Sequence, residues 1–367
     1  MGAAPFFPPA PGPRGERHRR REIWTRRRSD RGYAARGEVM NAMGDADAVV
    51  LVEELRKRYP RGVIALDGIS FAVAPGETFA LLGPNGAGKS TAVRILATLT
   101  RADAGRARVA GHDVAREAGR VRAAIGYVAQ ATGTDKEATG RENLVLQGRL
   151  YHMPGPRIRE RASQLIQWLD LGGAADRLTR GYSGGMRRRL DVAMGLVHEP
   201  RVLFLDEPTT GLDPESRSAL WRDLQRLKAR TGLTILLTTH YLEEADEAAD
   251  RVAIVDHGRI VAMGTPAELK AQIRGDAVVL DLVPAQAPGA RDLVAALPGV
   301  RDVTLEGRTL RCRVAEGARM LPQLITALDR AGLSVLSAAV RRPSLDDVYL
   351  HHTGHAFLSG APEAVGP

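Results

Sequence analysis

The sequence predicts an α/β fold with a mostly parallel sheet, followed by a smaller α+β domain. Buried-strand patterns recur at residues 78–82, 202–206 and 234–239, and a helical pattern at residues 217–230 lies between the last two. This strand–helix–strand alternation is typical of parallel sheets covered on both faces. After residue 275 the pattern changes to β-α-β-β-α-β, which is the order of a ferredoxin-like unit.

Structured sequence is expected from residue 49 onward. Strand-like runs at residues 49–59 and 68–83 precede a helical stretch at about 138–175, where apolar residues recur at spacings of three and four. This stretch predicts a helical insert between strands. The expected domains are a disordered Arg/Pro-rich extension over 1–46, a first domain over 47–275 with its helical part at about 138–200, an accessory α+β domain over 276–354, and a flexible tail over 355–367.

Composition excludes several classes of protein. The single cysteine among 367 residues excludes a disulfide framework and any cysteine-built zinc or iron–sulfur site. No run approaches the roughly 18 to 20 consecutive apolar residues of a membrane helix, so the chain is not expected to cross a bilayer alone. These features fit a soluble intracellular protein of two or more domains.

Positive charge is concentrated at the start of the chain. Residues 1–40 hold ten arginines and four acidic residues, whereas the formal charge of the whole chain is +9. The rest is therefore close to balance, which does not favour a nucleic-acid-binding fold. Two interpretations of the extension stay open. Either it has no function, and is not translated if Met40 or Met43 begins the protein, or its arginines contact RNA or anionic lipid.

Residues 83–90 read Gly-Pro-Asn-Gly-Ala-Gly-Lys-Ser and match the phosphate-loop pattern G-x-x-x-x-G-K-[ST]. They follow the predicted strand 78–82, which is the required context. The glycines let backbone N–H groups turn inward around an anion, and the next helix points its positive end at the phosphates. Lys89 adds a charge near the β- and γ-phosphates, and the Ser90 hydroxyl is a candidate Mg2+ ligand.

A second motif is the apolar strand 202–205, which ends in Asp206 and Glu207. Alternation along a strand gives these carboxylates different directions. Asp206 is expected to face the metal ion, and Glu207 to polarise the attacking water. After a phosphate loop, this pair indicates hydrolysis of a nucleoside triphosphate.

Four further residues are each weak evidence of function when taken alone. Gln130 could be a loop amide, Ser183 a helix N-cap, Asp213 a turn or cap residue, and His240 a polar strand end. Their order along the chain, relative to the two motifs above, is what indicates function.

In this order the motifs resemble the ATP-binding cassette family over about residues 49–275. The resemblance implies a P-loop NTPase fold with a mostly parallel sheet, antiparallel N-terminal strands and a helical insert. It implies Lys89, Gln130, Glu207 and His240 as catalytic residues and Ser90, Gln130 and Asp206 as Mg2+ ligands. The implied ATP-binding residues are Tyr59, Gly83, Pro84, Asn85, Gly86, Ala87, Gly88, Lys89, Ser90, Thr91, Gln130, Ser183, Gly184, Gly185, Asp206, Asp213 and His240. Tyr59 would stack on adenine, and strand-edge packing is its alternative.

A narrower resemblance rests on three features. Residues 182–186 read Tyr-Ser-Gly-Gly-Met where many cassettes have Leu-Ser-Gly-Gly-Gln, residues 187–191 read Arg-Arg-Arg-Leu-Asp, and residues 343–354 form a characteristic tail. Together they resemble ATP-binding subunits of daunorubicin-resistance-type drug exporters, although related lipid and polysaccharide exporters share parts of the pattern. This implies export of a hydrophobic drug, antibiotic or lipid.

The family resemblance also implies partners. Two copies would face head to tail, so that Ser183 and Gly185 of one copy complete the γ-phosphate site of the other. The helical insert would rest on a separate multi-helix membrane permease, at the cytoplasmic face of a bacterial membrane. No nucleic acid is expected as a partner, and cargo would contact the permease.

Two other classes share the motifs. A soluble cassette ATPase acting on DNA or ribosomes is the alternative, but ribosome factors usually carry two cassettes, and repair ATPases carry a coiled-coil arm and zinc cysteines. A non-hydrolysing sensor would lack Glu207 or His240, and both are present.

The remaining candidates are expected to be structural. The arginines at 187–189 are expected in an exposed helical turn with Arg187 and Asp191 paired. His351 and His355 have the spacing of a metal pair, but no third ligand accompanies them in the sequence. Cys312 is expected to be a packing residue, and Glu243, Glu244 and Glu247 are expected to form a solvated helix face. The accessory domain is expected to stabilise a dimer, to regulate, or to pack on the first domain.

Overall fold

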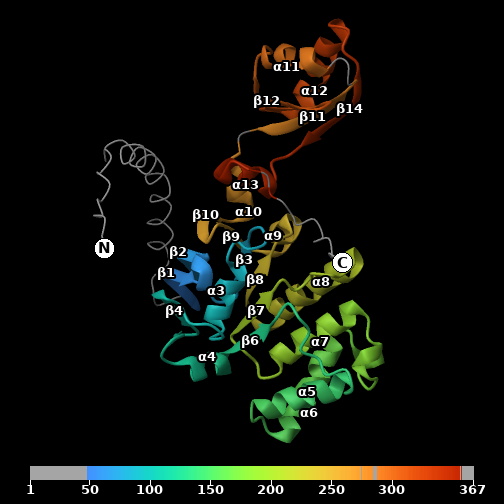
Figure 1. The fold of residues 1–367 in the computed structure, drawn as a ribbon. Coiled ribbons are helices and arrows are strands. Elements are labelled where there is room, and N and C mark those ends of the chain that lie inside the picture. Colours follow the sequence, from blue (N-terminus) through green and yellow to red (C-terminus); the bar gives the residue numbers. More distant parts are fainter. Residues whose placement is uncertain (1–47, 274, 284–286, 356, 358–367) are drawn as a thin grey trace, which may run out of the picture. The chain divides into compact units, whose positions relative to one another are not determined.

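The computed structural model describes residues 48–273, 275–283, 287–355 and 357 (Figure 1). The Arg/Pro-rich extension and nearly all of the expected tail lie outside the described residues. Within the described ranges, no helix is both long enough and apolar enough to cross a membrane.

The first domain (residues 48–273) is built on a six-stranded sheet in the order β10-β9-β3-β8-β7-β6. Its strands are β3 (Thr78–Leu82), β6 (Ile125–Val128), β7 (Val202–Asp206), β8 (Thr234–Thr239), β9 (Arg251–Asp256) and β10 (Arg259–Gly264). All pairs are parallel except β9 with β10. Every residue of β3, β7 and β8 is buried, which explains their continuous apolar runs and confirms the predicted parallel sheet.

A second sheet has the order β2-β1-β4-β5 and only antiparallel pairs. Its strands are β1 (Val50–Arg58), β2 (Ile64–Val73), β4 (Ala104–Val109) and β5 (His112–Asp113). Phe71 of β2 stacks on Phe79 of β3 with 5.1 Å between ring centroids. One apolar cluster joins both sheets to the helix α3 (Lys89–Leu96). The antiparallel N-terminal strands of the expected fold are confirmed.

The helical insert is formed by α5 (Gly140–Leu150), α6 (Gly155–Trp168) and α7 (Gly184–Leu196), drawn in green in Figure 1. Thr139 begins α5 with a reciprocal capping box to Glu142. The other helices of this domain are α4 (Ala118–Ala124), α8 (Pro214–Thr231), α9 (Leu242–Ala248) and α10 (Pro266–Ala271), with short 3-10 turns at Pro60–Gly62, Gly172–Ala174 and Thr179–Gly181.

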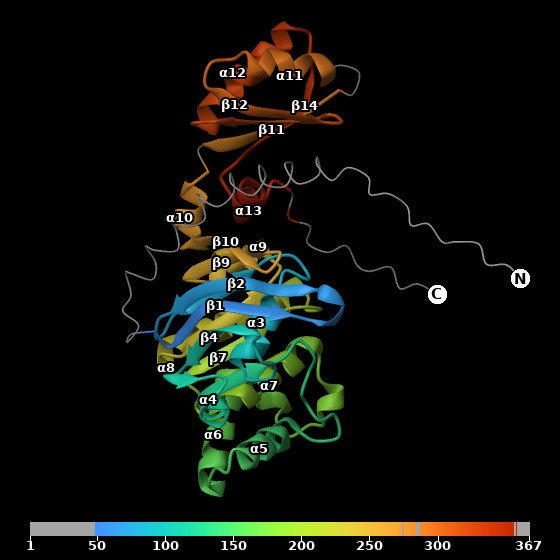
Figure 2. The same ribbon diagram turned by 60° about the vertical axis from the view of Figure 1, so that its left-hand side comes forward.

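The second domain (residues 275–341) has a four-stranded antiparallel sheet in the order β12-β13-β11-β14. Its elements are β11 (Asp276–Leu282), α11 (Ala287–Ala295), β12 (Val300–Glu306), β13 (Thr309–Val314), α12 (Gly317–Arg330) and β14 (Val335–Arg341). Figure 2 shows α11 and α12 on one side of this sheet. The order of elements and strands is that of the predicted ferredoxin-like pattern.

The last helix, α13 (Leu345–Thr353), follows the second domain in sequence but packs on the first. Leu345, Val348 and Tyr349 belong to the apolar cluster of the parallel sheet and its helices. The helix contacts α9, α10 and β10. Asp347 also accepts a hydrogen bond from Arg313 of β13. Thus α13 connects the two domains.

Candidate active site

The phosphate loop joins the buried strand β3 to α3. Gly86 and Gly88 have φ values of 81° and 107°, which favour glycine. A Cβ at Gly88 would also lie 2.2 Å from the Ala65 carbonyl oxygen. No side chain of the described part of the chain caps α3, so the amides of its first turn face the loop without a side-chain acceptor. This fits a cradle for an anion at the helix N-terminus.

Lys89 places a positive charge inside this loop. Its side chain is buried, and Nζ donates to the carbonyl oxygens of Gly83 (2.7 Å) and Pro84 (3.0 Å). Burial lowers the pKa of Lys89, while Glu207, whose Oε1 is 3.7 Å from Nζ, opposes that shift. The ammonium group therefore lies between the loop carbonyls and the carboxylates at the end of β7.

Asp206 and Ser90 bring together two oxygen groups suited to Mg2+. Ser90 Oγ donates to Asp206 Oδ1 at 2.7 Å, and Thr238 Oγ1 donates to the same oxygen at 2.8 Å. Asp206 is almost completely buried. Because hydroxyl and carboxylate oxygens are preferred Mg2+ ligands, this pair fits the expected metal site beside the phosphate loop.

The Glu207 carboxylate lies close to three of the predicted residues, Gln130, His240 and Lys89. Its Oε2 accepts hydrogen bonds from Gln130 Nε2 (3.4 Å) and Thr210 Oγ1 (3.2 Å), and His240 Nδ1 lies 3.2 Å from the same oxygen. The His240 imidazole lowers the pKa of Glu207, burial opposes this, and Lys89 adds to the lowering. The carboxylate is thus held in its ionised form, as a group that accepts a proton from water must be.

The backbone of Glu207 explains why the two carboxylates take different directions. Its φ is +47°, an uncommon value for a residue with a side chain. Its N–H donates to Thr238 Oγ1 at 2.9 Å, and this holds the turn in place. Asp206 consequently faces Ser90, whereas Glu207 faces Gln130 and His240.

Sequence reasoning missed Arg188, a buried residue of α7. Its guanidinium donates to four carbonyl oxygens, those of Ala129 (2.6 Å), Pro208 (2.6 Å), Asp206 (3.3 Å) and Glu207 (3.3 Å). Burial lowers the pKa of Arg188, and nearby Asp191 opposes this. Arg188 therefore ties the loop that carries Gln130 to the end of β7 and to the start of α7.

The expected pairing of Arg187 with Asp191 is wrong. Asp191 is buried, lies 3.9 Å from Arg188 Nη1, and accepts hydrogen bonds from Thr132 Oγ1, Gly133 N and Thr134 Oγ1 at 2.9–3.1 Å. The physical reason is that this side of α7 faces the Gln130 loop and not solvent. A run of arginines in sequence therefore does not show which member is buried.

The structure also corrects the expected exposure of Glu244 in α9. It was expected on a solvated helix face, but it is buried and accepts hydrogen bonds from Thr239 Oγ1 (2.8 Å) and Thr209 Oγ1, with Arg217 Nε 3.4 Å away. Burial raises the pKa of Glu244. Glu243 and Glu247 are exposed, as expected. Glu244 thus links the segments that follow β7 and β8.

The Ser183–Gly185 turn lies away from the groups around Lys89. Ser183 caps α7, since its Oγ accepts from Met186 N at 3.2 Å, and both Ser183 and Gly184 are exposed. A Cβ at Gly185 would lie 2.8 Å from Ser216 Oγ, so this turn adjoins the start of α8. Among the described contacts, none joins Ser183 to the phosphate loop of its own chain.

Asp213 and Tyr59 each make local contacts within the chain. Asp213 caps α8 by accepting from Ser216 N at 2.9 Å, and the Ser216 side chain together with this N–H lowers the pKa of Asp213. Tyr59 follows β1, is partly exposed, and has Lys57 Nζ 5.7 Å from its ring centroid. Val63 and Ile64, which follow it closely in the chain, are exposed apolar residues.

Comparisons with known proteins show which families the chain resembles. The family described as "ABC transporter" matches residues 66–210, and the family described as "ATP-binding protein DrrA1-3-like, C-terminal domain" matches residues 264–353. The daunorubicin resistance ATP-binding protein DrrA3 of Streptomyces coeruleorubidus is 48% identical over 84% of this chain and 97% of its own length. The doxorubicin resistance ATP-binding protein DrrA of Mycobacterium tuberculosis is 45% identical over 85% and 95%.

More distant similarities extend the comparison. The Nod factor export ATP-binding protein I of Ralstonia nicotianae is 40% identical over 83% of this chain and 94% of its own length. Among solved structures, cbiO1 from Clostridium perfringens, described as part of the ABC transporter complex cbiONQ, has a TM-score of 0.57 at 29% identity, covering 69% of this chain and 96% of that one. This solved structure supports the cassette fold.

Proposed function

The chain belongs to the ATP-binding cassette transporter family, as an ATPase of the daunorubicin-resistance type, and we propose that it drives a separate membrane permease by ATP-dependent dimerisation. The observation that carries the proposal is Glu207. Its ionised carboxylate lies among Gln130, His240 and Lys89, at the open end of the parallel sheet. This is the arrangement that hydrolysis of a triphosphate requires.

In the proposed reaction, water attacks the γ-phosphorus, and ADP and inorganic phosphate leave. Glu207 orients the water and accepts its proton, while Lys89 and the amides at the start of α3 offset the negative charge on the phosphates. A Mg2+ ion held by Ser90 and Asp206, with Gln130 as a further ligand, would supply additional positive charge. His240 holds Glu207 in its ionised form.

A second copy of the chain would complete the site. Ser183 and Gly184 are exposed and begin a helix, so their side of α7 can receive the γ-phosphate bound to another copy. The same geometry in both directions gives a two-fold pair. Tyr59 would stack on adenine at the partly exposed end of β1.

The helical insert is the proposed contact with the permease. Leu146 and Leu150 lie one turn apart on α5, and they are 50% and 65% exposed. Two neighbouring exposed leucines favour burial against another protein. α5 packs on α7, and Arg188 of α7 bonds to the carbonyl before Gln130 and to those of Asp206 and Glu207. These contacts give a path from the proposed permease contact to the site. The protein would then work at the cytoplasmic face of the membrane.

The proposed cargo is a hydrophobic drug, antibiotic or lipid. The relatives named for daunorubicin and doxorubicin resistance and for Nod factor export support this range. The cargo would contact the permease and not this chain.

The experiment compares Glu207→Gln with Ser183→Arg in the purified protein. Glu207→Gln is expected to bind ATP normally, to lose nearly all phosphate release, and to form a dimer in ATP that light scattering detects. Ser183→Arg should bind ATP as a monomer, because the new side chain blocks the surface offered to the second copy. Normal phosphate release by Glu207→Gln, or a Glu207→Gln protein that stays monomeric in saturating ATP, would contradict the proposal.

A further inference from the structure

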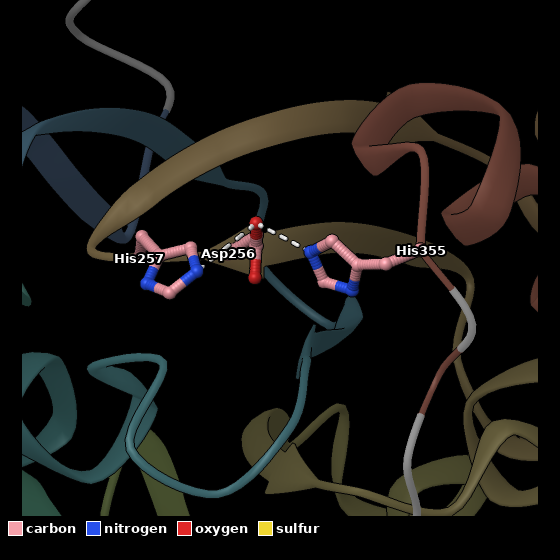
Figure 3. Close-up of side chains that lie close together, drawn as sticks. All are labelled: Asp256, His257 and His355. Atoms are coloured by element: carbon pink, nitrogen blue, oxygen red, sulfur yellow. Dashed lines mark ion pairs between the residues drawn. The ribbon is translucent and has the colours of Figure 1, made fainter.

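Three side chains that could bind a metal ion converge at the turn between β9 and β10. Asp256 is the last residue of β9, His257 lies in the turn, and His355 follows α13. Figure 3 shows the two imidazoles on either side of the Asp256 carboxylate. Asp256 Oδ2 is 3.6 Å from His355 Nε2 and 4.0 Å from His257 Nε2. The three candidate ligand atoms all lie within 4.8 Å of one another.

The carboxylate is oriented by a buried partner. Tyr349 is fully buried in α13, and its hydroxyl donates to Asp256 Oδ1 at 3.0 Å. Asp256 itself is 12% exposed. With Oδ1 held by Tyr349, Oδ2 is the oxygen that faces both imidazoles. A hydrogen bond that fixes a ligand carboxylate in this way is a regular feature of metal sites in proteins.

We propose that Asp256, His257 and His355 bind a divalent transition-metal ion of the Zn2+ type. Imidazole nitrogen and carboxylate oxygen are ligands for Zn2+, Co2+ and Ni2+, whereas Mg2+ and Ca2+ prefer oxygen alone. Metal–ligand bonds of about 2.0–2.2 Å place neighbouring ligand atoms roughly 3.3–3.5 Å apart in a tetrahedral site. The pair at 3.6 Å is close to that distance, and the 88% exposed ring of His257 can rotate to close the remaining gap.

The geometry also explains why the sequence did not indicate this site. His351 and His355 are four residues apart, which suggests two ligands on one helix face. However, α13 ends at Thr353, and Gly354 turns the chain with a φ of 80°. His355 therefore leaves the helix and meets Asp256, which lies about a hundred residues earlier in the chain.

Metal binding here would have a structural consequence for the phosphate loop. Gly258, in the same turn as His257, donates its N–H to the Ala87 carbonyl oxygen at 3.0 Å, and its own carbonyl accepts from Asp67 N at 2.8 Å. The ion would join this turn to the segment after α13. It would thereby hold the end of the last helix against the turn that supports the phosphate loop.

The test uses the full chain without an affinity tag and without nucleotide, titrated with Co2+ and Zn2+. We expect one saturable Co2+ site, with the visible absorption of a nitrogen- and oxygen-ligated ion. His257→Ala and His355→Ala should each weaken binding at least tenfold. The matched control is His351→Ala, since His351 is exposed on α13 outside the cluster; its affinity should stay within twofold of the unchanged protein.

A second measurement reports on structure. Saturating Zn2+ should raise the melting temperature of the unchanged protein and of His351→Ala, but not that of His257→Ala, because an ion that binds only the folded state stabilises it. Mg2+ in place of Zn2+ should give no such difference between variants. Absence of saturable Co2+ binding, or equal affinity in the His257→Ala, His355→Ala and His351→Ala proteins, would overturn the proposal and leave the three residues as ordinary ion pairs.

Discussion

The two domains differ in whether they bury polar and charged side chains. In the first domain, several buried charged residues lie near the carboxyl ends of the parallel strands, among them Lys89, Arg188, Asp206 and Glu244. In the described part of the second domain, the buried side chains are apolar apart from the thiol of Cys312. Burial raises the pKa of that thiol to about 11, so it stays protonated and packs like a small apolar residue.

Sheet topology accounts for this difference. Parallel strands covered on both faces expose only their ends, so binding and catalytic groups collect there. The antiparallel sheet of the second domain is covered on one face by α11 and α12, while β12 and β14 keep many exposed residues. Substitutions of buried residues should therefore alter chemistry in the first domain and only stability in the second.

The largest effect on ATP hydrolysis expected from a residue outside the predicted catalytic set is that of Arg188→Met. Four carbonyl oxygens would lose a donor, including those of Asp206 and Glu207. Removing a donor from a buried acceptor costs about 1–3 kcal/mol where no other donor remains, and the Glu207 carbonyl keeps the Thr210 N–H at 3.3 Å. We expect ATP hydrolysis to be about 100-fold slower, which corresponds to an increase of about 3 kcal/mol in the activation free energy. Phosphate release at saturating ATP measures this loss.

The controls for this prediction come from the same run of arginines. Arg187→Ala should leave hydrolysis within a few-fold of normal, and Arg188→Lys should recover part of it because an ammonium group supplies three donors. ATP affinity should change little in Arg188→Met, since Arg188 has no contact with the phosphate loop among the described residues. Equal losses in Arg187→Ala and Arg188→Met would show that the buried contacts do not matter.

The parts of the site that could be predicted are those encoded by short stretches of sequence. The phosphate loop is eight consecutive residues after a strand, and Asp206 and Glu207 follow an apolar run directly. The periodicity of apolar residues likewise predicts the order of strands and helices in the second domain, and the antiparallel sheet confirms it. In each case the local pattern determines the local structure.

Arg188 and Glu244 could not be predicted because their partners are distant in sequence. The Ala129 carbonyl is 59 residues from Arg188, and Thr209 is 35 residues from Glu244. A polar residue on a helix is normally assigned to solvent unless the element packed on it is known. The packing of α13 on the first domain was not predicted for the same reason, since the apolar face of a helix does not indicate which element it packs on.

An effect on stability without an effect on hydrolysis is expected for Leu328→Ala in the second domain. Leu328 of α12 is fully buried, so the substitution should lower the free energy of unfolding of this domain by about 2–5 kcal/mol. ATP affinity of the purified protein should not change. Urea unfolding and nucleotide titration measure the two quantities. Ile325→Ala, on the same helix but 37% exposed, is the matched control with a smaller loss.

This point substitution is a sharper test than removal of everything after residue 275. Truncation would also delete Leu345, Val348 and Tyr349, which belong to the core of the first domain. Loss of ATP binding after truncation could then come from the missing α13. Leu328→Ala could also make the free energy of ATP binding less favourable by as much as it lowers the free energy of unfolding. In that case the prediction that buried residues of the second domain affect only stability is wrong.

The smallest effect is expected for Glu244→Gln, and its value lies in its pH dependence. Burial raises the pKa of Glu244 above its ordinary value of 4.5, so the folded protein binds a proton that the unfolded chain releases. The unchanged protein should therefore lose stability relative to Glu244→Gln as pH rises from 4.5 through the folded-state pKa, and the difference should be constant below 4.5. At neutral pH we expect a change on the order of 1 kcal/mol, the scale of one hydrogen bond. Urea unfolding from pH 4 to 8 measures it, with exposed Glu243→Gln as the control that shows no such slope. Parallel curves for the two variants would mean that Glu244 is ionised without penalty, and that the polar core of the first domain tolerates charge as easily as its surface does.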